Sequence, residues 1–148
     1  MRLHRRDGGS ALVEFAIVAP VLLLLMIGIL EAGRALNAYV TVRNAGAEGA
    51  HWAALHPGAT ETAIGDMVRG RITSFDASLV DVNAKMNDGT AWVSWPTDGI
   101  PESSPKPQII PIAVEVSSTW SGVTFIGHFF PGGSGATFTS RATADAVR

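Results

Sequence analysis

A run of sixteen uncharged residues near the amino terminus restricts what this chain can fold into more than any other feature. The run, FAIVAPVLLLLMIGIL, extends from Phe15 to Leu30. With the five residues before it, it forms the segment 10–30, which carries a single charge, at Glu14. A helix needs about 20 apolar residues to cross a ~30 Å hydrocarbon core. The segment therefore predicts a transmembrane helix, which accounts for a substantial part of a chain of 148 residues.

The residues before the apolar run predict its orientation. Three arginines, Arg2, Arg5 and Arg6, outweigh Asp7 in the first nine residues. Positively charged flanks remain on the cytoplasmic side of a membrane. We therefore expect a single pass through a membrane, with a cytoplasmic amino terminus and an extracytoplasmic carboxy-terminal part beyond about Arg34.

Two other interpretations of the apolar run are less favoured. A secretory signal peptide has a basic start and small residues at its cleavage site, and RALNA at 34–38 offers such a site. However, the apolar part of a signal usually spans about 7 to 15 residues without a charge, whereas this run is longer and follows Glu14. A buried core helix of a soluble protein would need a polar face for water, which the run lacks.

Charge and residue content argue against several classes of function. The net charge is −2 and no basic cluster follows the first six residues, which argues against nucleic-acid binding. The chain has no cysteine, so disulfides and thiolate sites are excluded. The four histidines form no HExxH pair, and His51 and His56 lie near a predicted helix end, where a capping role is common. No GxSxG sequence is present. We expect no catalytic residues, metal site or cofactor, and hence no enzyme.

The acid at the start of the run needs an explanation, because insertion scales assign roughly 2.5 to 3.5 kcal/mol to an acid at mid-membrane and less near the end of a span. If the chain were cut between Gly9 and Ser10, a new α-amino group would form on Ser10. Glu14 would then be the fifth residue, on the same helix face one turn away. The carboxylate could pair with this amine in its own chain or in a neighbouring chain.

In this region the sequence resembles the type IV pilin-like proteins, whose short basic leader ends in glycine and precedes a chain with glutamate at its fifth position. Gly9, Ser10 and Glu14 match these three features. Residues 8–54 are most similar to the TadE-like pseudopilins of tight-adherence (Flp) pilus systems. Those proteins typically have an ALVEF start, an internal proline and glycine, an acid-x-Gly-Arg exit and then an Asn-Ala-Ala helix. The residues that fit this order here are Pro20, Gly28, Glu31, Gly33, Arg34, Asn44 and Ala45.

The resemblance implies a structural role and a set of partners. Prepilin peptidase would remove the leader 1–9, and the mature chain would act with other pilins or pseudopilins and the assembly machinery in a pilus or related secretion filament. Glu14 and Phe15 would serve assembly, and the residues predicted for helix packing are Pro20, Gly28, Gly33, Gly46, Ala50 and Ala54. The alternative is an unprocessed single-pass envelope domain that binds a ligand or partner protein.

Beyond the transmembrane segment 10–34, helical spacing continues through a predicted neck at 35–56. Two rows of small residues run along it at intervals of four, and such rows let another backbone approach closely. They are Gly46, Ala50 and Ala54, and Ala45, Gly49 and Ala53. We favour packing on the protein's own head, with a neighbouring subunit as the alternative.

The remainder, 57–148, is predicted to form a small antiparallel α+β head. Apolar spacing indicates a helix from about 60 to 75, and alternation indicates strands in 78–86, 90–95, 110–120 and 137–146. The apolar run 123–130 is interpreted as a core strand or packed loop, and Trp92, Trp95 and Trp120 as core residues. The resemblance further implies that the sheet leans on the outer half of the long amino-terminal helix.

Overall fold

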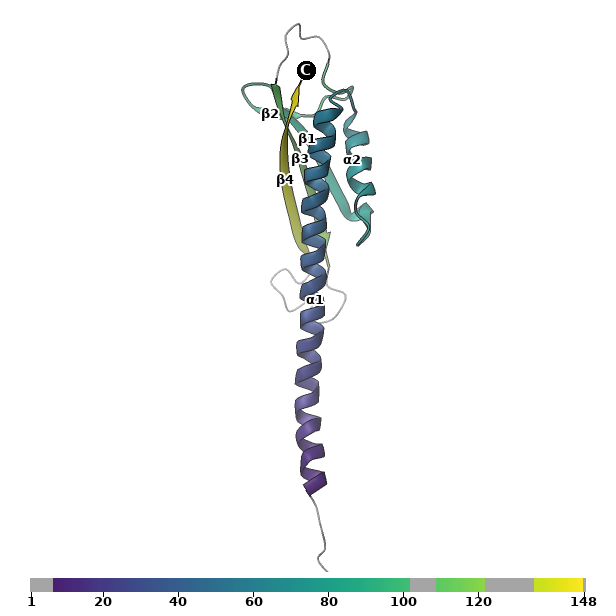
Figure 1. Ribbon diagram of the computed structural model, residues 1–148, viewed down its shortest axis with the longest axis vertical. Helices are drawn as coiled ribbons and strands as arrows, with labels where there is room; N and C mark the ends of the chain where they lie inside the picture. The colour runs from purple at the N-terminus through teal and green to yellow at the C-terminus, as the bar shows by residue number, and fades with distance from the viewer. Residues whose placement is uncertain (1–6, 102–108, 122–134, 148) are drawn as a thin grey trace, which may run out of the picture.

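The computed structural model describes residues 7–101, 109–121 and 135–147, with side chains from Gly9 onward. The leader arginines, His4, His128 and the apolar run 123–130 lie outside the described residues. Within the described residues the predicted α+β class is confirmed: a long amino-terminal helix, a second helix and a four-stranded antiparallel sheet. The helix extends far beyond the sheet, as Figure 1 shows.

Helix α1 (Asp7–Leu55) is a single helix of 49 residues. At 1.5 Å per residue it is about 74 Å long, more than twice the thickness of a hydrocarbon core. It begins three residues before the predicted start at Ser10 and continues through Pro20. Proline has no backbone N–H, so the carbonyl of Ala16 lacks the usual donor four residues on.

The end of α1 is closed by local interactions around His56. The backbone N–H of His56 donates to the carbonyls of Trp52 and Ala53 at 3.0 and 3.2 Å. Its ring Nδ1 lies 2.9 Å from the Trp52 carbonyl oxygen, and the imidazole stacks on the indole at 4.3 Å. Because terminal carbonyls of a helix lack partners within the helix, these contacts satisfy them. The predicted capping role is confirmed for His56.

Helix α2 (Glu61–Gly70) begins at an N-cap, where the Thr60 hydroxyl accepts from the Ala63 N–H at 3.2 Å. The prediction that this helix reaches Phe75 is wrong. Arg71 and Ile72 donate to carbonyls only three residues back, and this tighter pattern ends the helix. Ile72 is nevertheless buried and Phe75 partly buried, so both continued the apolar pattern without being helical.

The sheet has the strand order β2-β1-β3-β4, and each neighbouring pair is antiparallel. A short 3₁₀ helix, η1 (Ala77–Leu79), leads into β1. The strands are β1 (Val80–Asn87), β2 (Trp92–Ser94), β3 (Ile109–Trp120) and β4 (Ala136–Val147). Strands β3 and β4 pair along their whole length, from Ile109 opposite Val147 to Trp120 opposite Ala136.

Strand β2 (Trp92–Ser94) begins two residues later than the predicted 90–95, and the turn before it explains this later start. The Asp88 carboxylate accepts from the N–H groups of Thr90 and Ala91 at 2.8 and 2.9 Å. An aspartate that bonds the backbone two or three residues on holds a turn rather than a strand. Residues 90 and 91 therefore belong to the turn and not to the strand.

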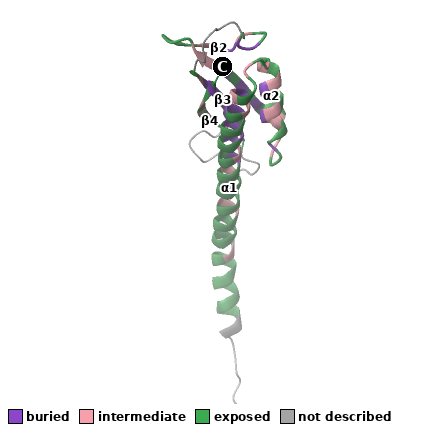
Figure 2. Ribbon diagram, turned by 45° about the horizontal axis from the view of Figure 1, so that its top comes forward, coloured by how far each residue is buried: buried purple, intermediate pink, exposed green. Residues whose placement is uncertain are grey.

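The core lies between one face of the sheet and the two helices, as the burial colours in Figure 2 show. The carboxy-terminal part of α1 contacts β3 and β4, and α2 contacts β1. Ile112, Val114 and Val116 on β3 are fully buried, and such side chains each contribute about 1.5–3 kcal/mol. The alternation predicted for the strands is confirmed. The neck residues Val42, Ala45, Ala50 and Ala53 belong to this same core.

The tryptophans are only partly core residues. Trp95 is buried, and its indole Nε1 donates to the Ala59 carbonyl at 2.8 Å. Trp120 is half-buried, but the core assignment of Trp92 is wrong because this side chain is 38 % exposed. The guanidinium of Arg141 lies 4.6 Å from the centre of the Trp92 ring, an arrangement typical of cation–π contacts.

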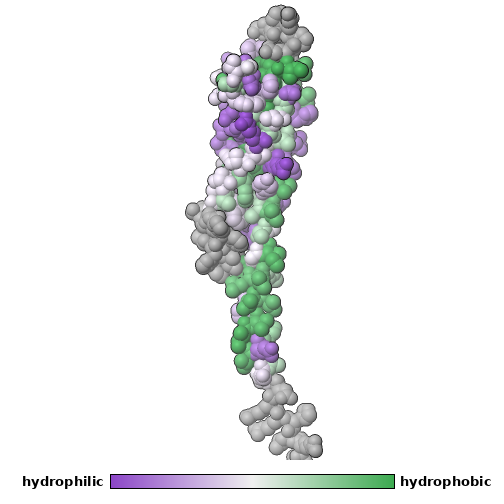
Figure 3. All heavy atoms as spheres, turned by 90° about the vertical axis from the view of Figure 1, so that its left-hand side faces the viewer, coloured by the Kyte–Doolittle hydropathy of each residue, from purple (hydrophilic) through white to green (hydrophobic). Residues whose placement is uncertain are grey.

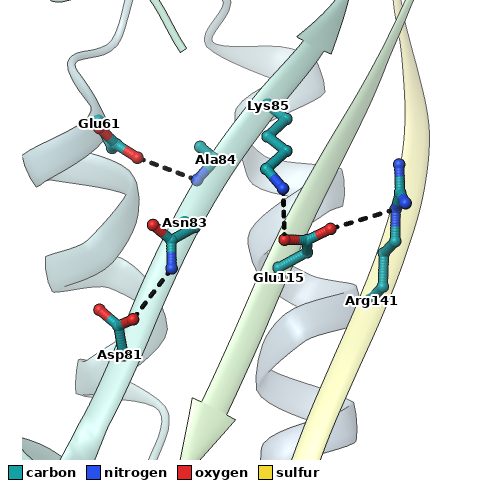
Figure 4. A network of polar contacts seen from close by, with 7 residues as sticks. All are labelled: Glu61, Asp81, Asn83, Ala84, Lys85, Glu115 and Arg141. Carbon is teal, nitrogen blue, oxygen red and sulfur yellow. Dashed lines mark hydrogen bonds and ion pairs between the residues drawn. The ribbon is translucent and has the colours of Figure 1, made fainter. Parts of the chain in front are cut away.

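The polar residues of β1, β3 and β4 form a network on the sheet (Figure 4). Lys85 and Arg141 both contact the Glu115 carboxylate, at 2.7 and 3.6 Å. On the helix side of β1, Glu61 accepts from the Ala84 N–H at 3.1 Å. Partly exposed ion pairs of this kind contribute up to about 1 kcal/mol each. These ion pairs therefore give Lys85, Glu115 and Arg141 a structural role in the sheet.

Candidate functional site

The candidate site is the amino-terminal end of α1. Gly9, Ser10, Glu14 and Phe15 all lie in the first turns of the helix, and all are exposed. Ser10 and Glu14 are four residues apart, which corresponds to a rise of about 6 Å and slightly more than one full turn. The two residues therefore project from the same side of the helix, as the spacing predicted. An amine on Ser10 and the Glu14 carboxylate could interact in one chain or across two chains.

The surroundings of Glu14 are apolar and lack contacts with the described part of the head. Among the described residues one helix, Gly9–Leu55, is long and apolar enough to cross a membrane, and its apolar window is 0 % buried. Figure 3 shows hydrophobic side chains along this projecting part of the helix. Phe15, for example, is 67 % exposed. Such a surface needs lipid or other protein around it, which indicates membrane anchoring.

The six residues predicted for helix packing divide into two sets. Gly28 and Gly33 have open space where a Cβ atom would stand, and Pro20 is exposed. By contrast, a Cβ on Gly46 would lie 3.3 Å from Val116 Cγ2. Ala50 is fully buried and Ala54 partly buried against the core. The carboxy-terminal set thus packs on the protein's own sheet, while the amino-terminal set remains available for contacts with other helices.

The described part of the head contains few converging reactive groups. No group of three His, Asp or Glu side chains that could hold a metal ion occurs among the described residues. His51 is exposed, and the Glu115 carboxylate is used by Lys85 and Arg141. The chemistry available at the candidate site is the binding of a cation by Glu14, in an environment where charge is costly to leave unpaired.

An apolar groove that no sequence pattern indicated lies at the end of the head nearest the exposed part of α1. The groove has a volume of about 570 Å³, and its lining comes from α1, the end of β3 and the start of β4. Its described lining residues are Glu31, Ala32, Ala35, Leu36, Tyr39, Trp120, Ala136 and Phe138. These residues are far apart in the sequence, so no spacing pattern could have shown that they meet.

Comparison with known proteins bears on the amino-terminal third of the chain. A protein-family model described as TadE-like protein matches residues 9–51. No curated protein and no solved structure matches the chain. The matched segment contains the candidate site and the small-residue rows as far as Ala50. The match confirms the TadE-like resemblance over these residues.

Proposed function

We propose that this chain, TadE-like over residues 9–51, is a minor pseudopilin of a tight-adherence pilus system. Prepilin peptidase cuts it between Gly9 and Ser10 in the inner membrane, with the amino terminus in the cytoplasm and the head outside. The mature protein acts in assembling or priming the pilus with other pilins or pseudopilins. Its role is structural rather than enzymatic.

One observation carries this proposal: Ser10 and Glu14 share one side of an exposed, apolar helix. Cleavage before Ser10 would place an ammonium group one turn from the carboxylate. In the apolar interior the attraction between opposite charges is much stronger than in water. Each new subunit would therefore gain a partner for its membrane-embedded Glu14 carboxylate, either its own amine or the amine of a neighbour.

The local helix is also suited to processing. Gly8 and Gly9 lie in the first turn of α1, directly before the proposed cut. Each glycine destabilises a helix by roughly 0.5–1 kcal/mol relative to alanine. The first turn can therefore unwind at low cost and expose the Gly9–Ser10 peptide bond to the peptidase.

The contacts of α1 assign different roles to its two parts. From Ser10 to Leu30 every side chain is exposed or half-exposed. Beyond Ala38 one side of the helix packs in the head core. The first part, including Phe15, Pro20 and Gly28, is thus left for helix packing with other subunits in the membrane. The second part of α1 is packed into the head and is held outside the membrane.

The decisive experiment measures processing and assembly in the native host. The amino-terminal sequence and intact mass of the membrane protein are determined for the wild type and for Gly9→Leu. Pilus assembly is then scored for Glu14→Ala and Glu14→Gln. Asp66→Asn is the matched control, because Asp66 is an exposed carboxylate on α2 of the head.

We expect a wild-type chain that begins at Ser10 and a Gly9→Leu chain that stays uncut. Both Glu14 variants should remain in the membrane and lose pilus assembly, whereas Asp66→Asn should assemble normally. A wild-type chain that begins at Met1 would instead support an unprocessed, membrane-anchored binding domain. Normal piliation in the Glu14→Ala variant would show that Glu14 is not needed for assembly.

A further inference from the structure

The apolar groove lies where the head meets the projecting part of α1. One wall is the helix segment 31–39, and the other is formed by Trp120 at the end of β3 and Phe138 near the start of β4. The ends of these strands point toward the exposed half of the helix in Figure 1. Tyr39 and Phe138 meet edge to face at 5.9 Å between ring centres. The groove is therefore a feature of the head's base.

Counting along the helix gives the depth of this groove relative to a membrane. If the hydrocarbon core ends near Leu30, then Leu36 lies about 9 Å and Tyr39 about 14 Å beyond it. The interfacial layer on each side of a bilayer is roughly 5–8 Å thick. The lower part of the groove, from Glu31 to about Ala35, therefore lies within the layer of lipid headgroups. Its upper part, at Leu36 and Tyr39, rises just above that layer.

The chemistry of the surrounding residues fits the border between lipid and water. The groove is almost entirely apolar, and Tyr39 and Trp120 belong to the residue types enriched where a membrane meets water. Leu36 is 64 % exposed beside them. On another side of the helix, the exposed Arg34 lines a smaller cavity of about 210 Å³ with Asn37, Ser118 and Ser121. A guanidinium at this height is placed to attract lipid phosphate.

We infer that the groove binds an acyl chain of a phospholipid from the leaflet that faces the head. This lipid contact holds the head against the membrane surface, with Arg34 attracting neighbouring anionic headgroups. The inference rests on the membrane-anchoring part of the proposed function and adds a lipid site to it. It does not depend on cleavage at Gly9 or on pilus assembly.

The test uses the quenching of tryptophan fluorescence by lipid. The full chain is reconstituted into phosphatidylglycerol and phosphatidylethanolamine vesicles, with or without bromine atoms on the acyl chains. Flotation of the vesicles reports anchoring separately. Trp120→Phe removes the reporter in the groove, and Trp92→Phe is its control on the outer strand β2. Ala35→Phe fills the groove, and Ala47→Phe places the same ring on an exposed position of α1.

We expect brominated chains to quench the wild type. Trp120→Phe should lose most of this quenching and Ala35→Phe should reduce it, whereas both control variants should behave as wild type. Full flotation with equal quenching in Ala35→Phe and Ala47→Phe would overturn the lipid site and leave anchoring intact. Failure to float would overturn anchoring as well.

A second copy of the chain is the competing occupant of the groove. Because the chain has no cysteine, Leu36→Cys gives a single reporter for it. If the groove binds lipid, this variant should stay monomeric on oxidation at a high lipid-to-protein ratio. Disulfide-linked dimers together with absent quenching would assign the groove to a neighbouring subunit and overturn the lipid site.

Discussion

Gly49 and Gly33 lie on the same helix, but a side chain would meet different surroundings at the two positions. A Cβ on Gly49 would stand 2.5 Å from Val68 Cγ2, whereas a Cβ on Gly33 would meet nothing within 4 Å. Val68 is fully buried and cannot easily move aside. The missing side chain at Gly49 therefore sets how closely α1 and α2 approach.

We expect Gly49→Ala to lower the free energy of unfolding of the head by about 1–3 kcal/mol, the usual cost of an overpacked core. Gly33→Ala is the matched control and should leave the head's stability unchanged. Denaturant unfolding followed by tryptophan fluorescence in detergent micelles measures both. Equal stability of the two variants would show that α1 and α2 are not closely packed at Gly49.

The turn before β2 makes the stability of the fold depend on pH through one residue, Asp88. Hydrogen bonds from the Ala91 N–H and from the hydroxyl and N–H of Thr90 lower the pKa of the Asp88 carboxyl below its ordinary value. Because the folded-state pKa is the lower one, the stabilisation is present above the unfolded-state pKa. It is lost as the pH falls through the folded-state pKa.

We predict that carbon-13 NMR titration of the chain in micelles will place the pKa of Asp88 below that of an unstructured aspartate. Thr90→Val removes the hydroxyl donor at 2.7 Å and should raise this pKa toward the ordinary value. A titration of Asp88 at or above the ordinary value would contradict the turn geometry.

At the scale of the element, α1 belongs to two environments without a break in its backbone. Its first half has no buried residue before Glu31, whereas Val42 and Ala53 in its second half are core residues. Apart from the Ala16 carbonyl opposite Pro20, a single helix satisfies its backbone hydrogen bonds internally in both environments, which is the condition for crossing lipid. The element can therefore join the membrane to the head without a flexible linker.

This division predicts a position-dependent effect of an added charge. Leu23→Arg should impair membrane insertion, because an arginine at the centre of a span costs about 2.5–3.5 kcal/mol. Leu55→Arg is the control, since Leu55 is equally apolar and 65 % exposed but ends the helix in the head. The fraction that resists carbonate extraction from membranes measures both. Equal retention of the two variants would argue against a span at Leu23.

At the scale of the whole molecule, the head is a two-layer unit built onto the end of its own anchor. The anchor helix supplies part of the core, so the head has no complete core without residues 38–53 of α1. We therefore expect the orientation of the head to follow the orientation of the helix in the membrane.

The topology can be tested with single cysteines, because the chain has none. In spheroplasts of a host without the peptidase, Asp66→Cys should react with a membrane-impermeant maleimide. Arg6→Cys should react only after lysis, because arginine-rich flanks stay inside. Labelling of Arg6→Cys in intact spheroplasts would show that the orientation is the opposite of the one proposed.

Some of the structure followed from local pattern alone. The long helix, the buried side of each strand and the Ser10–Glu14 spacing were predictable, because helical and strand periodicity are fixed by backbone geometry. The end of α2 and the length of β2 were not, because Ile72 and Phe75 keep an apolar spacing in a turn and Asp88 captures two N–H groups. Side-chain hydrogen bonds of that kind leave no period in the sequence.

The sequence by itself determined that the chain has an apolar helix of membrane length. It also determined that this helix carries an acid, Glu14, about one turn after Ser10. Only the tertiary structure decided what the rest of that helix contacts. It placed Gly46 and Gly49 against β3 and α2, moved Trp92 out of the core, and brought Trp120 and Phe138 to the helix as a groove. The physical reason is that such contacts depend on strand register and on close approach between elements distant in the chain, which no local spacing encodes.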